Sequence, residues 1–124
     1  MTSSDVGDMH RIGGSRVENL RLKPHETTLD PPGISLLHAP SPGEAARQIC
    51  QAFPAVTALH HAAQVIASTT VDKIHQAGFD VWPNPTRKLP QHYRLIHPEG
   101  GAGFTDANLL RLSAVFLETS GHGI

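Results

Sequence analysis

Proline and glycine divide this chain into short segments. Ten prolines and eleven glycines are spread over 124 residues, and stretches such as 30–33 (Asp-Pro-Pro-Gly) are turn chemistry because proline fixes the backbone and glycine frees it. The apolar runs between them fall far short of the ~20 residues needed to cross a bilayer. We therefore expect short elements and no integral-membrane segment.

Length and composition predict one folded unit. The chain is 39% hydrophobic and 17% charged, which favours collapse onto one core without a metal or a disulfide. Cys50 is the single cysteine, and the N-terminus lacks the basic start and long apolar run of a secretory signal, so we expect a cytoplasmic protein. A formal net charge of -1 argues against a strong overall attraction to nucleic acid or to anionic membranes.

Three apolar segments are predicted to form strands. Residues 34–38, 79–82 and 93–97 are short runs near turn residues, and their length suits strands better than helices. In 93–97, alternation would bury Tyr93 and Leu95.

Two helix starts carry capping residues. Ser41 is followed three residues later by Glu44 and directly by a proline, so a helix should begin there and run to about Phe53. Thr105 predicts the start of a last helix that Gly121 closes. Its buried face would consist of Leu109, Leu112, Val115 and Phe116.

The middle of the chain is ambiguous. Residues 57–66 have helical spacing, and Thr69 with Asp72 predicts a second helix start. Residues 65–67 fit a strand equally well, because short apolar runs do not reveal their period.

Together these elements predict an α+β fold, with a small sheet of three to four strands covered by about three to four helices. Residues 16–124 would form the single compact domain. Within it, 16–22 fit a short edge strand or an extended segment packed on the body. Residues 1–15 show neither the strand nor the helix period, and we interpret them as a flexible N-terminal arm.

Nine histidines are the most unusual feature of the composition, because imidazole is an acid, a base or a metal ligand near neutral pH. Their spacing argues against a metal site. His60 and His61 would point about 100° apart on a helix, and no two histidines are separated by three residues. We therefore expect neither a metal nor another cofactor.

The strongest candidate site is the segment around the third predicted strand. Alternation would place His92 and Arg94 together on the more exposed face, where they could hold a phosphate or a carboxylate. Arg87 and Lys88 add positive charge, and His97 adds a second imidazole. The competing interpretation is the ordinary polar face of a half-buried sheet.

A second candidate is the glycine-rich loop 100–103 before the last helix, where Gly101, Gly103 and Thr105 could bind an anion through backbone N–H groups. Asp106 would repel that anion, and the loop matches neither the P-loop nor the dinucleotide fingerprint. A flexible turn explains the glycines as well. Among nucleophiles, Cys50 and Thr69 are better explained as a core residue and a helix cap.

Two functional hypotheses follow. The first is a protein-interaction module of the antitoxin, immunity or adaptor kind, in which exposed Trp82 with Arg87 and Arg94 contacts a protein partner. The second is a small enzyme or toxin acting on a phosphate-bearing substrate such as RNA or a nucleotide. In that case His92 or His97 would be the acid or base and the arginines would hold the anion. A homo-oligomer is compatible with either hypothesis.

Overall fold

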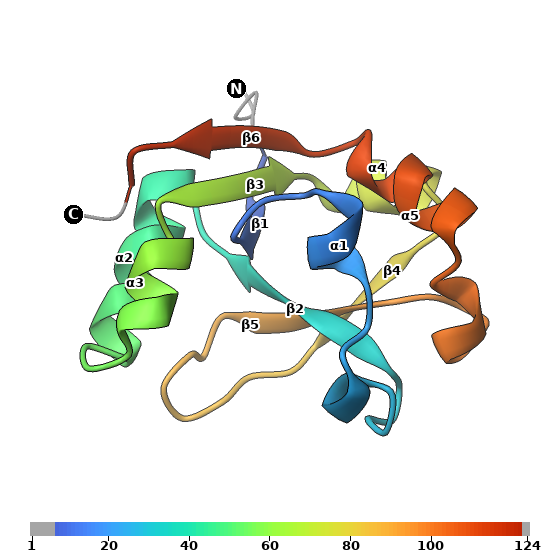
Figure 1. Cartoon of the computed structure of the whole chain (residues 1–124), viewed down its shortest axis with the longest axis horizontal. Coiled ribbons are helices and arrows are strands. Elements are labelled where there is room, and N and C mark those ends of the chain that lie inside the picture. Colours follow the sequence, from blue (N-terminus) through green and yellow to red (C-terminus); the bar gives the residue numbers. More distant parts are fainter. Residues whose placement is uncertain (1–6, 123–124) are drawn as a thin grey trace.

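The computed structural model describes residues 7–122. In them, six strands form one antiparallel sheet in the order β4-β5-β2-β1-β3-β6 (Figure 1). The strands are β1 (Met9–Ile12), β2 (Gly33–His38), β3 (Val65–Thr69), β4 (Asp80–Pro83), β5 (His92–Ile96) and β6 (Leu117–Ser120). The α-helices are α1 (Val17–Leu20), α2 (Pro42–Ala52), α3 (Thr57–Ala62), α4 (Val71–Gln76) and α5 (Asp106–Ser113), and two 3₁₀ turns are η1 (Pro24–Glu26) and η2 (Gly100–Gly103).

The α+β class is confirmed, but the predicted sheet of three to four strands is wrong. The described chain has six strands and five α-helices. The predicted strands correspond to β2, β4 and β5. The ambiguous segment 65–67 belongs to β3, whereas the sequence predicts an arm at β1 and the last helix at β6.

β1 occupies the centre of the sheet, between β2 and β3. Residues 9–12 are therefore part of the folded body, and the predicted boundary of the arm at residue 15 does not hold for them. Residues 1–6 of that predicted arm lie outside the described residues. A central strand is covered on both faces, so its sequence need not alternate between polar and apolar residues. In β1 the buried residues are Met9, His10 and Arg11.

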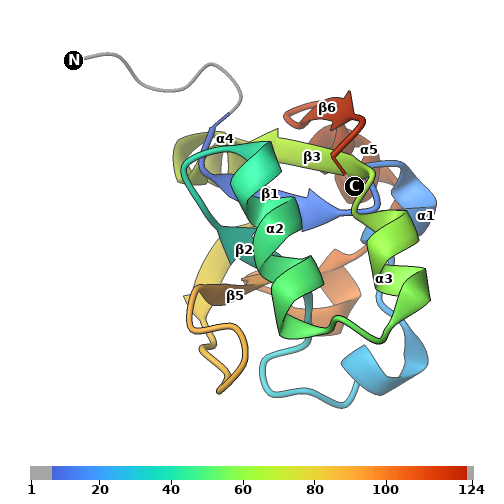
Figure 2. The same ribbon diagram turned by 90° about the vertical axis from the view of Figure 1, so that its left-hand side faces the viewer.

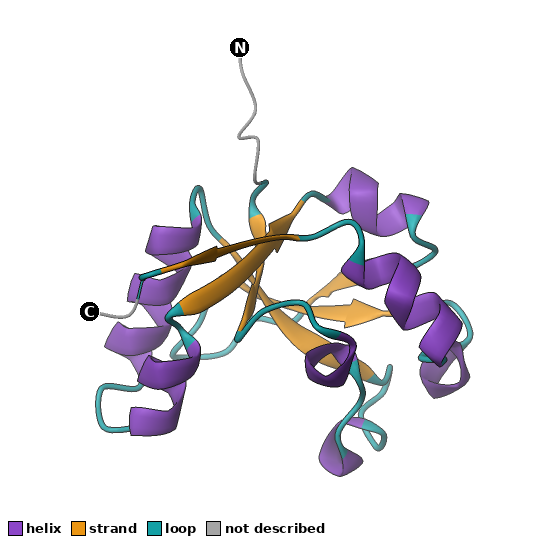
Figure 3. Ribbon diagram, turned by 45° about the horizontal axis from the view of Figure 1, so that its top comes forward, coloured by secondary structure: helices purple, strands orange, loops and turns teal. Residues whose placement is uncertain are grey.

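Helices cover both faces of the sheet and enclose two apolar cores. One core packs β2 and β5 against α1, α4 and α5, and its fully buried members include Leu36, Ile74, Leu95 and Leu109. The other lies under α2 and α3 and includes Ile49. Figure 2 shows α2 and α3 side by side, and Figures 1 and 3 show them at the opposite end of the molecule from α4 and α5. The predicted burial of Leu95 is confirmed, and Tyr93 is half-buried against the same core.

Two of the three predicted helix caps are confirmed. The Ser41 hydroxyl accepts a hydrogen bond from the Glu44 backbone N–H (3.1 Å), and Thr105 caps α5 in the same way through Asn108. The cap predicted at Thr69 is wrong, because Thr70 caps α4 instead. Thr69 ends β3 and donates its hydroxyl proton to the Val115 carbonyl (2.8 Å).

The last helix is shorter than predicted. α5 ends at Ser113, and residues 117–120 pair with β3 as an edge strand. Leu109 and Leu112 are buried as expected. Val115, which is predicted on the same helix face, lies instead in the turn that leads into β6, where its carbonyl accepts the hydrogen bond from Thr69. Near the N-terminus, Val17–Leu20 form a short helix instead of the expected strand or extended segment.

Within residues 7–122, no helix has the length and apolar character required to span a membrane.

Candidate functional site

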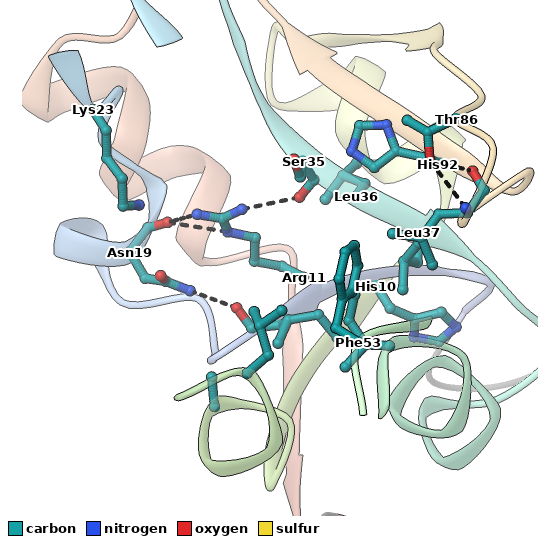
Figure 4. A pocket seen from close by; sticks show the side chains of 15 residues that line it. His10, Arg11, Asn19, Lys23, Ser35, Leu36, Leu37, Phe53, Thr86 and His92 are labelled. Atoms are coloured by element: carbon teal, nitrogen blue, oxygen red, sulfur yellow. Dashed lines mark hydrogen bonds between the residues drawn. The ribbon is translucent and has the colours of Figure 1, made fainter. Parts of the chain in front are cut away.

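A pocket of about 470 Å³ lies beside the centre of the sheet, within the size range of small-molecule sites. Its walls come from β1, β2 and α1, from the C-terminal half of α2, from α3, and from the segment between β4 and β5 (Figure 4). Residues from distant parts of the chain thus meet in one cavity.

Arg11 is the chemically most distinctive residue of the pocket. β1 and β2 are paired at Met9 and His10 only, and beyond that point the guanidinium group bridges the two segments. Its Nη1 donates to the Ser35 carbonyl (3.0 Å), and its Nε and Nη2 both donate to the Asn19 carbonyl (3.1 and 2.6 Å). A guanidinium has five N–H groups, so one N–H on each terminal nitrogen is left without an acceptor among residues 7–122.

The positive charge of Arg11 has no carboxylate in contact among the residues that the structure describes. Arg11 is 7% exposed and takes part in none of the ion pairs within the described chain. Burial lowers the pKa of Arg11, and the charge of nearby Glu26 opposes that change. The Glu26 carboxylate instead accepts the backbone N–H of Lys23 (2.7 Å). Burying a charge without a contacting counter-charge is costly, so an anion bound at Arg11 would be stabilised.

The pocket has a cationic end and an apolar end. Lys23 lines it with Arg11, and Figure 4 shows both side chains on the same side of the cavity. No aspartate or glutamate of the described part of the chain is among the lining residues. The apolar lining comes mainly from β2, α2, α3 and the loop before β5, namely Leu37, Ile49, Phe53, Leu59, Ala62 and Leu89.

His92 is the one residue of the sequence-predicted site that lines this pocket. Its Nδ1 lies 2.8 Å from the Asn84 carbonyl oxygen, and because a carbonyl only accepts, Nδ1 is the donor in this hydrogen bond. Its Nε2 forms no hydrogen bond within residues 7–122.

Arg94 and His97 do not join His92 in the pocket. Arg94 shares the sheet face of His92 but donates to the Pro31 carbonyl (2.8 Å). His97 lies on the other side, where its ring packs edge-on against Phe79 at 4.9 Å. Of the two candidate acids or bases, His92 and His97, only His92 therefore lines the pocket.

The remaining predicted residues lie outside this pocket. Trp82 is 48% exposed on the edge strand β4, Arg87 is exposed in the loop after it, and the Lys88 amine lies 5.1 Å from the centre of the Phe53 ring.

The glycine-rich loop is explained by packing and capping. Gly103 is buried against the His97 ring, which a Cβ would overlap. The Thr105 hydroxyl is used as the cap of α5, and Asp106 forms an ion pair with Arg21 (2.5 Å). Gly101 is exposed in the 3₁₀ turn. Among residues 7–122, no group of histidine, cysteine, aspartate or glutamate side chains could hold a metal ion.

Sequence reasoning missed Arg11 because it lies in the segment interpreted as an arm. The one available signal was the run Met9–Ile12, four non-glycine residues with high side-chain volume between glycine-containing stretches. That signal is weak, since only the position of β1 between two other strands makes the arginine buried.

Comparisons with protein-family models, with curated proteins and with solved structures find no match for this chain. The pocket is therefore interpreted from its own chemistry.

Proposed function

We propose that this protein is a binding module whose pocket holds a small ligand with an anionic group on an apolar body. The observation that carries the proposal is the buried Arg11 guanidinium, which lines the pocket. Within residues 7–122 two of its N–H groups have no acceptor, and no carboxylate contacts it. Paired N–H donors of arginine match the oxygens of carboxylates and phosphates. The apolar end would hold the remainder of the ligand.

The experiment is an NMR titration of the protein with two small anions, benzoate and phenyl phosphate, and with neutral benzyl alcohol. We expect at least one anion to shift the amide signals of pocket residues in β1, α3 and the segment before β5. Benzyl alcohol should shift them far less, because it cannot satisfy the charge of Arg11. Equal responses to all three compounds, or none, would exclude an anion site.

A variant at Arg11 strengthens this test. Arg11→Lys keeps the charge but loses the planar set of donors, so anion binding should weaken while the apolar end of the pocket stays intact. The variant also leaves backbone carbonyls with fewer donors, so its fold must be checked by its own NMR spectrum. Arg87→Lys is the matched control, because Arg87 is exposed and outside the pocket.

The interaction-module hypothesis remains a second proposal, and exposed Trp82 supports it. Large exposed aromatic side chains are enriched among the residues that dominate protein interfaces. Trp82 lies opposite Arg94 in the register of β4 and β5 and is the single tryptophan, so its fluorescence reports on this surface alone. A second copy docking there would shift the emission to the blue as concentration rises, and constant emission would exclude self-association through Trp82.

The enzyme hypothesis has less support from the geometry. It assigns the acid or base to His92 or His97 and the binding of the anion to Arg87 and Arg94. Of these four residues, only His92 lines the pocket with Arg11 and Lys23.

A further inference from the structure

The ligand class can be narrowed by the charges at the cationic end of the pocket. Arg11 and Lys23 both line it and both carry a full positive charge at neutral pH. They come from different parts of the chain, Arg11 from β1 and Lys23 from the segment that precedes η1. The Lys23 side chain forms no ion pair among the described residues.

A carboxylate and a phosphomonoester differ in how well they match this pair of cations. A carboxylate carries one negative charge, which the two free N–H groups of Arg11 would satisfy. The Lys23 ammonium would then have no anionic partner in the pocket. A phosphomonoester carries a charge of about −1.5 to −2 at pH 7 and three acceptor oxygens. It can accept from both Arg11 and Lys23.

The apolar end of the pocket places a second requirement on the ligand. Phe53, Leu59 and Leu89 lie on the walls formed by α2, α3 and the loop before β5. They offer surface to a ring or to another flat apolar group, but no charge. Inorganic phosphate would leave this part of the pocket unused.

We infer that the ligand of this pocket is a phosphomonoester of a small, largely apolar alcohol or phenol, whose phosphate lies between Arg11 and Lys23. This inference rests on the proposed function and makes it more specific. Arg11 is the buried anchor, and Lys23, which is exposed, selects for the second negative charge.

The test is isothermal titration calorimetry of the full chain with phenyl phosphate, benzoate and inorganic phosphate. We expect phenyl phosphate to bind about tenfold or more tightly than benzoate, because it gains a charged hydrogen bond to Lys23. It should also bind more tightly than inorganic phosphate, which lacks the apolar part.

Lys23→Met provides the specific variant. Lys23 is exposed and its side chain makes no ion pair among residues 7–122, so this change should leave the fold intact. It should weaken phenyl phosphate more than benzoate, and so remove most of the preference for phenyl phosphate. Lys73→Met, on the exposed surface of α4 and outside the pocket, is the matched control and should change neither affinity.

The outcomes distinguish failure of the proposed anion-binding function from failure of the narrower phosphomonoester inference. If benzoate and phenyl phosphate bind equally well, and both weaken in Arg11→Lys, the binding module stands and the phosphomonoester inference is overturned. If inorganic phosphate binds as tightly as phenyl phosphate, the apolar part of the inference is overturned. If neither organic anion binds, the proposed function and this inference both fail.

Discussion

At the residue scale, two neighbouring polar side chains in β1 are buried for different reasons. His10 is 0% exposed, with Nε2 2.9 Å from the Ala39 carbonyl oxygen and Nδ1 2.8 Å from the Ser68 hydroxyl. Both ring nitrogens are therefore satisfied, and His10 is a structural residue of the core. Arg11 differs, because its N–H donors outnumber the acceptors that residues 7–122 supply.

His10 also predicts how stability depends on pH. Burial is the main cause that lowers the pKa of His10 below 6.5 in the folded protein. The unfolded chain takes up this proton at higher pH than the folded one, so the stability that His10 contributes is complete above about pH 6.5 and is lost as the pH falls. Chemical denaturation should show a free energy of unfolding that decreases from about pH 7.5 to about pH 5.

The control for this prediction uses two glutamine variants. His10→Gln removes the titrating group and should flatten the dependence on pH, whatever its effect on stability at neutral pH. His61→Gln, at an exposed position of α3, should keep the wild-type slope. Equal slopes in all three proteins would show that His10 titrates alike in the folded and unfolded states.

At the element scale, the local rules of helix capping hold at the start of α2. Ser41 has an extended backbone, its hydroxyl accepts from the Glu44 N–H, and Pro42 occupies the first helical position. The buried face of α2, Ala45, Ala46 and Ile49, covers the pocket side of the sheet.

Replacing Ser41 with alanine should lower the free energy of unfolding by about 1 kcal/mol, since the Glu44 N–H loses its acceptor. Thermal and urea denaturation measure this change. Ser120→Ala on the edge strand β6, whose hydroxyl forms no hydrogen bond in the described chain, should stay within about 0.5 kcal/mol of the wild type. Equal stabilities of the two variants would show that the Ser41 cap contributes nothing.

At the scale of the whole molecule, the order of the strands predicts which regions open first. β1, β2 and β3 are flanked on both sides, whereas β4 and β6 are edges of the sheet. Backbone hydrogen bonds at the centre break only when much of the sheet opens.

Hydrogen exchange should therefore be slowest at the paired amides of β1, β2 and β3 and faster in β6. β5 is also an interior strand and provides a reference for slow exchange. If the amides of 9–12 exchange as fast as those of β6, residues 9–12 are an arm, as the sequence suggested, and not the central strand.

The sequence alone was sufficient for elements whose causes are local. Helix caps and short apolar runs that end at a proline act over only a few residues. The starts of α2 and α5 could therefore be predicted from Ser41 and Thr105, and β2 and β5 from the apolar runs near residues 34 and 93. It was predictable, for the same reason, that His92 and Leu95 face opposite sides of the sheet, because side chains alternate along any strand.

Only the tertiary structure decided the places of β1 and β6 and the pocket around Arg11. The sequence around Arg11 has no apolar period, and its burial depends on carbonyls of Asn19 and Ser35 that approach it only in the folded chain. Arg94 is predicted to hold an anion beside His92, but in the folded chain its guanidinium donates to the carbonyl of Pro31, a residue far away in the sequence. Local rules act through neighbours in the chain, whereas burial and charge balance depend on neighbours in space.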